Sequence, residues 1–581
     1  MASSGAVVVV VYLLLLTCCV MGAVAVAEDS HTENPQNNDV STTSVPSALR
    51  IPSSCSLVMA QSSIANAGWG VFSLTDRAAG EAALDGDLVI QVSDLNTTFD
   101  SLWRITFDYA WDSQETGGQY EGIASVMSVI PGLGMLANGS PRDYNLLPVL
   151  EPRKDEAGVT RHNSAGAGAF THYHNYTFVL TKPLSAGSEL MANYGPNWFQ
   201  KRADLLPEEV QAAKSKRKLR RSTTELLQEG FCLDNLQSGT STLPHAGRGA
   251  FARRKLSKGS IVAPVPVLPI TNRNALDVTR VQQRSPTNSK VVTTHNLLLN
   301  YCYGHQNSSI LLFPYSPMVN LINHSPHNEA ANVQLQWSNF NQQHQKLTLD
   351  QLHQINTNSA SSTGSLLLEL VALRDIQPGE EILMDYGSDW QRAWNQHLEQ
   401  WKPYASSYVP SHVMDNAVSI LATQEELDKD NGKRGGYPAN IITSCFYKYQ
   451  TDTKNNNNKN IPSPSSKDIS TEAWTYFKGI YELRHLRPCN VMKRFFQGGD
   501  PHDKNNYLYT VMIRNRHGLT PTERIPTEQM HIVTQVSRRA IRFSDKIYTT
   551  DQHLEGAFRH DIRLADEIFP PQWMDLRDDK E

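Results

Sequence analysis

Short apolar runs separated by glycine, proline and asparagine turns make up most of this chain. They lie at residues 260–263, 310–313, 332–337 and 366–373, and again at 507–513, 530–535 and 540–543. Runs of this length, rich in β-branched and aromatic residues and bounded by turn residues, are typical of strands. The pattern predicts a mostly β fold with some α-helix, ending in a small β-rich domain at residues 471–581.

One apolar run at the N-terminus is of a different kind. Ala6–Val20 is almost wholly apolar, and Ala25-Val26-Ala27 stands just before Glu28. An apolar core followed by a small-x-small triplet is typical of a secretory signal peptide, although the first five residues hold no Lys or Arg. We expect a signal peptide at residues 1–27 and a location in the secretory pathway or endomembrane lumen. The alternative is a membrane anchor through residues 6–27, since about 20 apolar residues can span a bilayer. No later run is long enough, so no other span is expected.

Three polar stretches read as linkers. Residues 28–60 are rich in Pro, Ser, Thr and Asn at their start and are predicted to be a flexible leader. Residues 201–240 are predicted to be a helical linker. Residues 396–470 are predicted to hold a helix and then a linker that includes the low-complexity run Thr451–Ser470. The basic run Lys214–Arg221 is interpreted as a solvated helix face. A polyanion contact and a dibasic processing site are the alternatives.

The sequence contains an internal repeat. We call residues 61–200 region A and residues 241–395 region B. Three segments of region A match three of region B in the same order, at offsets of 179, 185 and 192 residues: Gly68–Phe72 with Gly247–Phe251, Met135–Pro141 with Asn320–Pro326, and Leu184–Gly195 with Ile376–Gly387. A tryptophan follows four residues after the last tyrosine in each, at Trp198 and Trp390. Repeated anchors in one order predict two copies of one domain.

Composition narrows the function only slightly. The chain has 581 residues and a net charge of −5, so three or four domains are expected and bulk charge gives no case for direct nucleic-acid binding. Two of the 7 cysteines, Cys18 and Cys19, lie in the predicted signal peptide, and the remaining five form no CxxC pair. No zinc site is therefore expected, and an odd number leaves at least one thiol unpaired in an oxidising lumen.

The motifs of region B resemble those of a SET domain, the fold of protein-lysine methyltransferases. The resemblance rests on Gly247-Arg248-Gly249, on Asn323-His324-Ser325 within LINHSPHNEAANV, and on Glu380–Gly387 (GEEILMDYG from Gly379). A GxG or NHS motif alone is weak evidence, whereas the three in order are strong evidence. The sequence has no clustered cysteines, which is similar to SET domains that lack zinc-binding flanks.

The resemblance implies a cofactor and a set of roles. S-adenosylmethionine would be bound by Gly247, Arg248, Gly249, Asn323 and His324, Tyr386 would be catalytic, and no metal is implied. The partner would be a protein or peptide bearing a lysine. Because free lysine has a pKa near 10.4, such a site must favour the neutral amine and align it with the methyl group. Taken singly, each residue has a structural alternative: turn glycines, a buried histidine, or a core tyrosine.

Two departures leave an alternative function open. Many active SET domains carry a Tyr-x-Gly after the first strand, but Ala263–Pro269 contains no tyrosine, and Tyr301, Tyr303 or Tyr315 would have to replace it. In region A, Gly139 and Asn193 stand where region B has His324 and Asp385, so region A is interpreted as a degenerate copy. The chain is accordingly expected to be a lysine methyltransferase acting through region B, or else an inactive SET-like scaffold that binds peptides or proteins.

Two further histidines are near the C-terminus. His553 and His560 are seven residues apart and are expected to have surface or packing roles rather than to bind a metal.

Overall fold

A computed structural model describes most of the chain beyond residue 50. The described residues are 51–92, 102, 105–112, 127–150, 157–171, 175–203, 211, 220–281, 290–325, 330–357, 366–429, 436–446, 471–473, 486–514, 530–546 and 548–574. The predicted signal peptide, nearly all of the basic run and the low-complexity run lie outside them. Within them, no helix is both long and apolar enough to cross a membrane.

The fold is mostly β, as the run pattern predicts: of the residues that the structure describes, 34% are in strands and 22% in helices. The predicted runs of region B are strands β13, β17, β19 and β20, and those near the C-terminus are β25, β26 and β27. β13 is longer than predicted, since it runs to Ile270 through three prolines.

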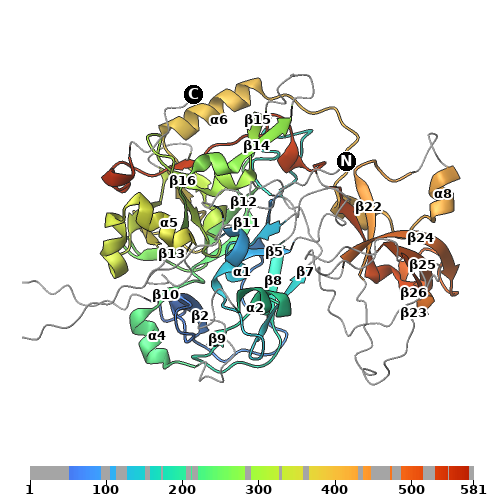
Figure 1. Ribbon diagram of the computed structural model, residues 1–581, viewed down its shortest axis with the longest axis horizontal. Helices are drawn as coiled ribbons and strands as arrows, with labels where there is room; N and C mark the ends of the chain where they lie inside the picture. Colours follow the sequence, from blue (N-terminus) through green and yellow to red (C-terminus); the bar gives the residue numbers. More distant parts are fainter. Residues whose placement is uncertain are drawn as a thin grey trace, which may run out of the picture. The chain divides into compact units, whose positions relative to one another are not determined.

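Region B is built on an eight-stranded mixed sheet, to which β28 near the C-terminus adds the last strand; Figure 1 labels its strands β13 and β16. Its order is β18 (Asn323–His324), β21 (Leu383–Met384), β19 (Val333–Trp337), β20 (Leu366–Ala372), β13 (Ile261–Ile270), β17 (Leu311–Pro314), β16 (Tyr303–Gly304) and β28 (Ile562–Arg563). Two hairpins flank it: β11 (Leu236–Thr240) with β12 (Arg248–Ala252), and β14 (Asp277–Val281) with β15 (Lys290–His295). The motif residues Asn323 and His324 therefore lie on an edge strand beside the Asp-Tyr-Gly segment.

Region A, together with a few residues before it and the strand β10 after it, forms three small sheets. These are β10 (Phe231–Cys232), β1 (Leu57–Gln61), β2 (Trp69–Ser73) and β9 (Glu189–Leu190); β3 (Asp87–Leu88), β8 (Asn175–Leu180) and β7 (Leu146–Leu150); and β4 (Ile90–Val92), β6 (Met127–Val129) and β5 (Ala110–Asp112). The hairpin β1–β2 has the same length and spacing as β11–β12.

The helices are short, apart from α6. They are α1 (Leu133–Leu136), α2 (Pro196–Arg202), α4 (Thr223–Glu229), α5 (Leu349–Thr357), α6 (Ser388–Gln400), α7 (Ser411–Ala417) and α8 (Gln424–Lys429). α6 follows the Asp-Tyr-Gly segment directly, and Gly387 precedes it with a φ of 93°, a backbone angle that favours glycine. Trp390 and Trp394 are four residues apart and so lie on one face of α6.

The C-terminal part has its own six-stranded sheet and its own buried core. The strand order is β23 (Thr471–Ala473), β26 (Met530–Ser537), β25 (Tyr507–Arg514), β24 (Leu486–Phe496), β22 (Ile441–Phe446) and β27 (Ile541–Asp545). β22 lies before the predicted boundary at residue 471, while β28 lies after it and pairs with β16 of region B. The exact domain limits stay a prediction.

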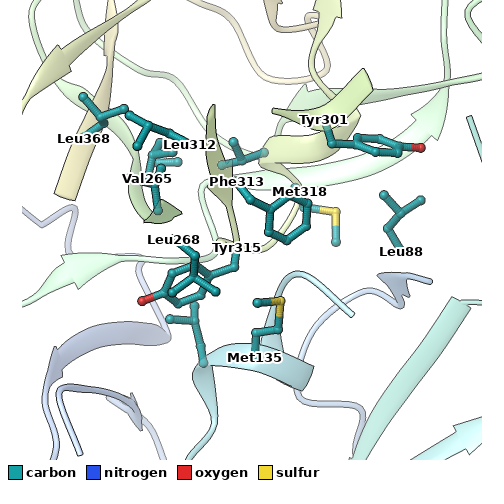
Figure 2. Close-up of a cluster of buried hydrophobic side chains, with 14 of the residues drawn as sticks. Leu88, Met135, Val265, Leu268, Tyr301, Leu312, Phe313, Tyr315, Met318 and Leu368 are labelled. Atoms are coloured by element: carbon teal, nitrogen blue, oxygen red, sulfur yellow. The ribbon is translucent and has the colours of Figure 1, made fainter. Parts of the chain in front are cut away.

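Regions A and B share one hydrophobic core. Figure 2 shows Leu88 and Met135 of region A beside Tyr301, Met318 and Tyr315 of region B, all part of one buried cluster. Two disulfides, Cys55–Cys232 and Cys445–Cys489, add covalent links, and Cys302 is a buried free thiol, as the odd cysteine count predicts. The side chains of one region can therefore contribute to a site in the other.

Candidate functional site

A cavity of about 330 Å³ brings together most of the predicted site residues. Arg248, Asn323, His324 and Tyr386 all line it, whereas Gly247 and Gly249 do not. The volume is at the lower end of the range of ligand pockets, about 300–1,000 Å³. Among the described residues, none of those lining it is Asp or Glu. The lining therefore offers the guanidinium of Arg248 to a carboxylate, and its tyrosine and tryptophan rings to other groups.

Glu381, quoted in the motif but given no role by the sequence, holds this site together. Its Oε1 accepts hydrogen bonds from Ser241 Oγ at 2.6 Å and Asn323 Nδ2 at 3.2 Å. Its Oε2 accepts from the Thr242 backbone N–H at 2.8 Å and from Thr242 Oγ1 at 2.5 Å. A buried carboxylate satisfied in this way fixes its neighbours, because each bond to a charged group is worth about 1.5–3 kcal/mol. The signal that could have found it is the internal repeat, which aligns Glu381 with Glu189 at the offset of 192 residues.

The side-chain amide nitrogen of Asn323 is used for hydrogen bonds within the protein. Its Nδ2 donates to Arg248 O at 2.9 Å as well as to Ser241 and Glu381. The amide thus ties the edge strand β18 to the hairpin β11–β12. Asn323 also lines the cavity.

His324 has both ring nitrogens engaged. Nδ1 accepts from the backbone N–H of Tyr386 at 3.0 Å, so Nε2 carries the proton and donates to Gln391 Oε1 at 2.7 Å. Burial lowers the pKa of His324. The ring is therefore neutral near pH 7 and acts as a fixed link between β18, Tyr386 and α6.

Three tyrosines approach one another in the cavity. The Tyr386 hydroxyl donates to Ile322 O, and burial raises its pKa, so it stays protonated. Tyr301 and Tyr303 also line the cavity, and burial likewise raises the pKa of Tyr303. Within the part of the chain that the structure describes, the Tyr303 hydroxyl makes no hydrogen bond. Tyr315 instead packs on Tyr109, 5.6 Å between ring centroids, away from the cavity.

The two glycines of the GxG motif act through close packing. Gly247 has a φ of 71°, and a Cβ there would lie 2.3 Å from Phe170 Cζ. A Cβ on Gly249 would lie 2.3 Å from Glu381 Oε1. Contacts under 3.0 Å are not tolerated, so a side chain at either position would displace Phe170 or Glu381. The glycines therefore do not line the cavity; they leave room for Phe170, which lines it, and for Glu381, which bonds to Asn323.

Aromatic side chains form one end of the cavity. The ring of Trp390 lies 4.8 Å from that of His324 and 5.0 Å from that of Tyr386. Trp394 and Phe558 continue this wall, 5.0 Å apart. Flat aromatic faces beside a polar edge suit a planar heterocycle.

The matching positions of region A have similar bonds but are packed differently. Glu189 accepts from Ser62 Oγ at 2.7 Å, the Ser63 backbone N–H at 2.9 Å and Asn138 Nδ2 at 3.3 Å. The Tyr194 hydroxyl donates to Ala137 O at 2.6 Å. A Cβ on Gly139 would lie 2.4 Å from Tyr194 Cδ2, so the tyrosine ring lies directly over this glycine.

No metal centre is found among the described residues. The one group of potential ligands there is Cys55, Cys232 and Asp234, and its two sulfurs are joined in a disulfide. His553 bonds to Thr550 Oγ1 and burial lowers its pKa to about 4, while His560 Nδ1 bonds to Asp561 O. Both histidines have packing roles in the structure.

Comparison with known proteins identifies region B. The family model of the SET domain matches residues 247–387. Among solved structures, a Plasmodium falciparum protein assigned as a histone methyltransferase is 20% identical over 27% of this chain and 96% of its own, with a TM-score of 0.16. The Chaetomium thermophilum polycomb repressive complex 2 is 17% identical over 29% of this chain and 18% of its own, with a TM-score of 0.17.

A second structure of that complex, bound to S-adenosylmethionine, is 17% identical over 26% of this chain and 17% of its own, with a TM-score of 0.17. Such low TM-scores support no further conclusion. No curated protein matches the chain. What the comparisons show is a SET domain at residues 247–387.

Proposed function

We propose that the chain transfers a methyl group from S-adenosylmethionine to a lysine side chain of a protein, through region B. The observation that carries the proposal is the single cavity that gathers Arg248, His324 and Tyr386 within a matched SET domain. Bound there, the cofactor would supply an electrophilic methyl group.

The residues of the cavity fit that cofactor. Arg248 lines the cavity, and a guanidinium pairs with a carboxylate through two parallel bonds. The face of Trp390 beside His324 suits an adenine ring. Arg248, His324 and the backbone of Asn323 would hold the cofactor, with Trp390 and Trp394 against its planar part.

The same surroundings favour a reactive amine. A lysine amine buried among apolar groups and tyrosines, with no carboxylate in the described lining, has its pKa lowered from about 10.4. Its neutral form is the nucleophile. Tyr386 stays protonated and anchored to Ile322 O, which fixes the ring beside the reacting amine.

Tyr303 takes the place of the tyrosine missing from Ala263–Pro269 in this proposal. It is buried and lines the cavity, and its hydroxyl makes no hydrogen bond within the described residues. It can therefore accept or donate a bond to the amine. Ala263–Pro269 itself lies in β13, a buried central strand, where a polar hydroxyl would need a partner.

Calorimetry on the full chain tests the proposal. We expect S-adenosylmethionine to bind to the wild type and to transfer its methyl group to lysine peptides, with transfer lowered about 10-fold or more by Tyr303→Phe. No binding at about 1 mM cofactor would contradict the enzyme and favour the alternative, a SET-like scaffold that binds peptides. Binding without transfer to any lysine in a peptide array would have the same meaning.

We further propose that region A is a degenerate copy of the same domain. The support is a pair of equivalent hydrogen bonds in each region. Asn138 donates to Glu189 in region A as Asn323 donates to Glu381 in region B. The Tyr194 hydroxyl donates to Ala137 O as the Tyr386 hydroxyl donates to Ile322 O. With Gly139 in place of a histidine, the Tyr194 ring fills the space. Region A is thus proposed to bind no cofactor and to support region B.

The proposed location is the secretory pathway. The disulfides Cys55–Cys232 and Cys445–Cys489 support it, because disulfides persist in oxidising compartments. A fluorescent reporter fused behind residues 1–30 should enter the endomembrane system. A diffuse cytosolic signal would contradict the signal peptide, and a carbonate-resistant membrane signal would favour the anchor.

A further inference from the structure

A segment of region A forms part of the cavity in region B. We call residues 164–171 (SAGAGAFT) the strap. Ala169, Phe170 and Thr171 line the cavity, as does Leu88, which Figure 2 places beside Tyr301 and Met318. The SET-domain match begins only at residue 247, so these side chains come from outside the matched domain.

Hydrogen bonds fix the strap to region B and to the C-terminal segment. Ser164 Oγ bonds to His245 Nδ1 at 2.9 Å, and Ala165 O bonds to His397 Nε2 at 2.9 Å. Gly168 O accepts from Arg559 Nη1 at 2.7 Å, and Ala169 O accepts from Asn300 Nδ2 at 2.7 Å. The strap is thus bonded along its whole length.

The small residues of the strap are required by its close contacts. A Cβ on Gly166 would lie 1.9 Å from His245 O, and one on Gly168, which has a φ of 83°, would lie 2.3 Å from Asp551 O. Phe170 in turn packs against Gly247, where no side chain could be accommodated. The glycines of the strap and of the GxG turn therefore fit each other.

Thr171 positions one of the cavity tyrosines. Its Oγ1 donates to Val89 O at 2.7 Å, and its backbone N–H donates to the Tyr301 hydroxyl oxygen at 3.2 Å. Thr171 is buried, so these bonds are shielded from water. With its oxygen held by this N–H, the Tyr301 hydroxyl has a fixed orientation at the cavity.

We infer that the strap is a wall of the cavity, and that region A thereby determines how well the lysine side chain of a substrate fits into the cavity of region B. Phe170 and Leu88 form an apolar surface for an aliphatic stem, and Thr171 orients Tyr301 toward its polar end. Phe170 and Thr171 are positioning residues. The catalytic consequence rests on the proposed function, whereas the docking of the strap does not.

Kinetics with matched variants test the wall. Phe170→Leu removes the ring that packs on Gly247, while Phe178→Leu makes the same change in the core of region A, away from the cavity. We expect Phe170→Leu to raise the KM for a lysine peptide about 10-fold with kcat changed less, and Phe178→Leu to leave both within about twofold. Equal effects of the two variants would overturn the inference.

A rescue experiment addresses Thr171. Thr171→Val keeps the volume but loses the bond to Val89 O, and Thr171→Ser keeps that bond. We expect the valine variant to raise KM about fivefold and the serine variant to restore it to within about twofold. If valine and serine behave alike, Thr171 is not a positioning residue.

Hydrogen exchange tests the docking without any ligand. In the wild-type chain the Thr171 amide should be protected, and Tyr301→Phe should raise its exchange rate about 10-fold, while Tyr303→Phe leaves it unchanged. Fast exchange at Thr171 in the wild type would overturn the wall. Protection at Thr171 in a chain that fails to bind S-adenosylmethionine would leave the wall standing and contradict the proposed function instead.

Discussion

Regions A and B have corresponding bonds but differ in what fills the space between them. In region B, His324 joins Tyr386 to α6 and leaves a cavity lined by Trp390. In region A, Gly139 occupies the corresponding position and the Tyr194 ring lies on it. The two tyrosines keep equivalent bonds to backbone carbonyls.

This comparison distinguishes residues that stabilise the fold in both regions from residues that form the cavity in region B. The bonds of Glu189 and Glu381 occur in both regions and so serve the fold. The histidine and the cavity that it lines occur in region B, where the histidine ring also bonds to the backbone of Tyr386. The hydrogen bonds of the two glutamates are thus present whether or not a histidine stands beside the asparagine that donates to each.

The largest effect is expected from the two glutamates. Glu381→Ala and Glu189→Ala each leave buried donors unpaired, so each should lower the free energy of unfolding by about 3 kcal/mol, measured by urea denaturation. Only Glu381→Ala should weaken S-adenosylmethionine binding, by about 10-fold or more, because Asn323 Nδ2, which also donates to Arg248 O, then loses one of its acceptors beside the cavity. Equal loss of binding in both variants would contradict the division between the regions.

The tyrosine pair gives the next effect. Tyr386→Phe should lower the transfer rate about 100-fold, or about 2.7 kcal/mol in activation free energy, because the ring loses its anchor to Ile322 O. Tyr194→Phe loses the equivalent bond to Ala137 O and should cost about 1 kcal/mol of stability without changing the rate. A rate change in the Tyr194 variant would show that region A takes part in the chemistry directly.

Gly139 provides a smaller test. Gly139→Ala places a methyl group against the Tyr194 ring and should destabilise the chain by about 2 kcal/mol. In a Tyr194→Leu background the same substitution should cost less, since the ring that it meets is gone. Thermal unfolding of the four chains of this cycle gives the coupling energy, and a value near zero would mean that the ring does not fill the site.

The sequence predicts the strands and the motif residues of region B better than it predicts their roles. Alternation and turn residues locate β17, β19 and β20 because they are local signals. The predicted run at residues 260–263 covers only the start of β13, which continues to Ile270 between β17 and β20 although prolines are usually excluded from central strands.

The roles depend on contacts that are distant in the chain. Gly249 was expected to approach the cofactor, but its lack of a side chain accommodates Glu381, 132 positions later. Phe170 and Thr171 have no motif at all and reach the cavity only through the shared core of regions A and B. Such pairings are a property of the folded chain, and no local pattern encodes them.

His324 gives the smallest expected effect, through pH. Burial lowers its folded-state pKa, while in the unfolded chain the pKa is near 6.5. Below pH 6.5 the unfolded chain takes up a proton that the folded chain refuses, so stability is full above that pH and falls as the pH drops, by at most about 1.4 kcal/mol per unit from this group. His324→Asn should make this slope shallower in urea titrations between pH 7 and 5, and the part that remains includes the contribution of His553, whose pKa burial lowers to about 4. Region A has Gly139 at this position, so Gly139→Ala should leave the slope intact. If His324→Asn leaves the slope unchanged, the ring is not held neutral in the folded chain, and the link between β18, Tyr386 and α6 is not made as described.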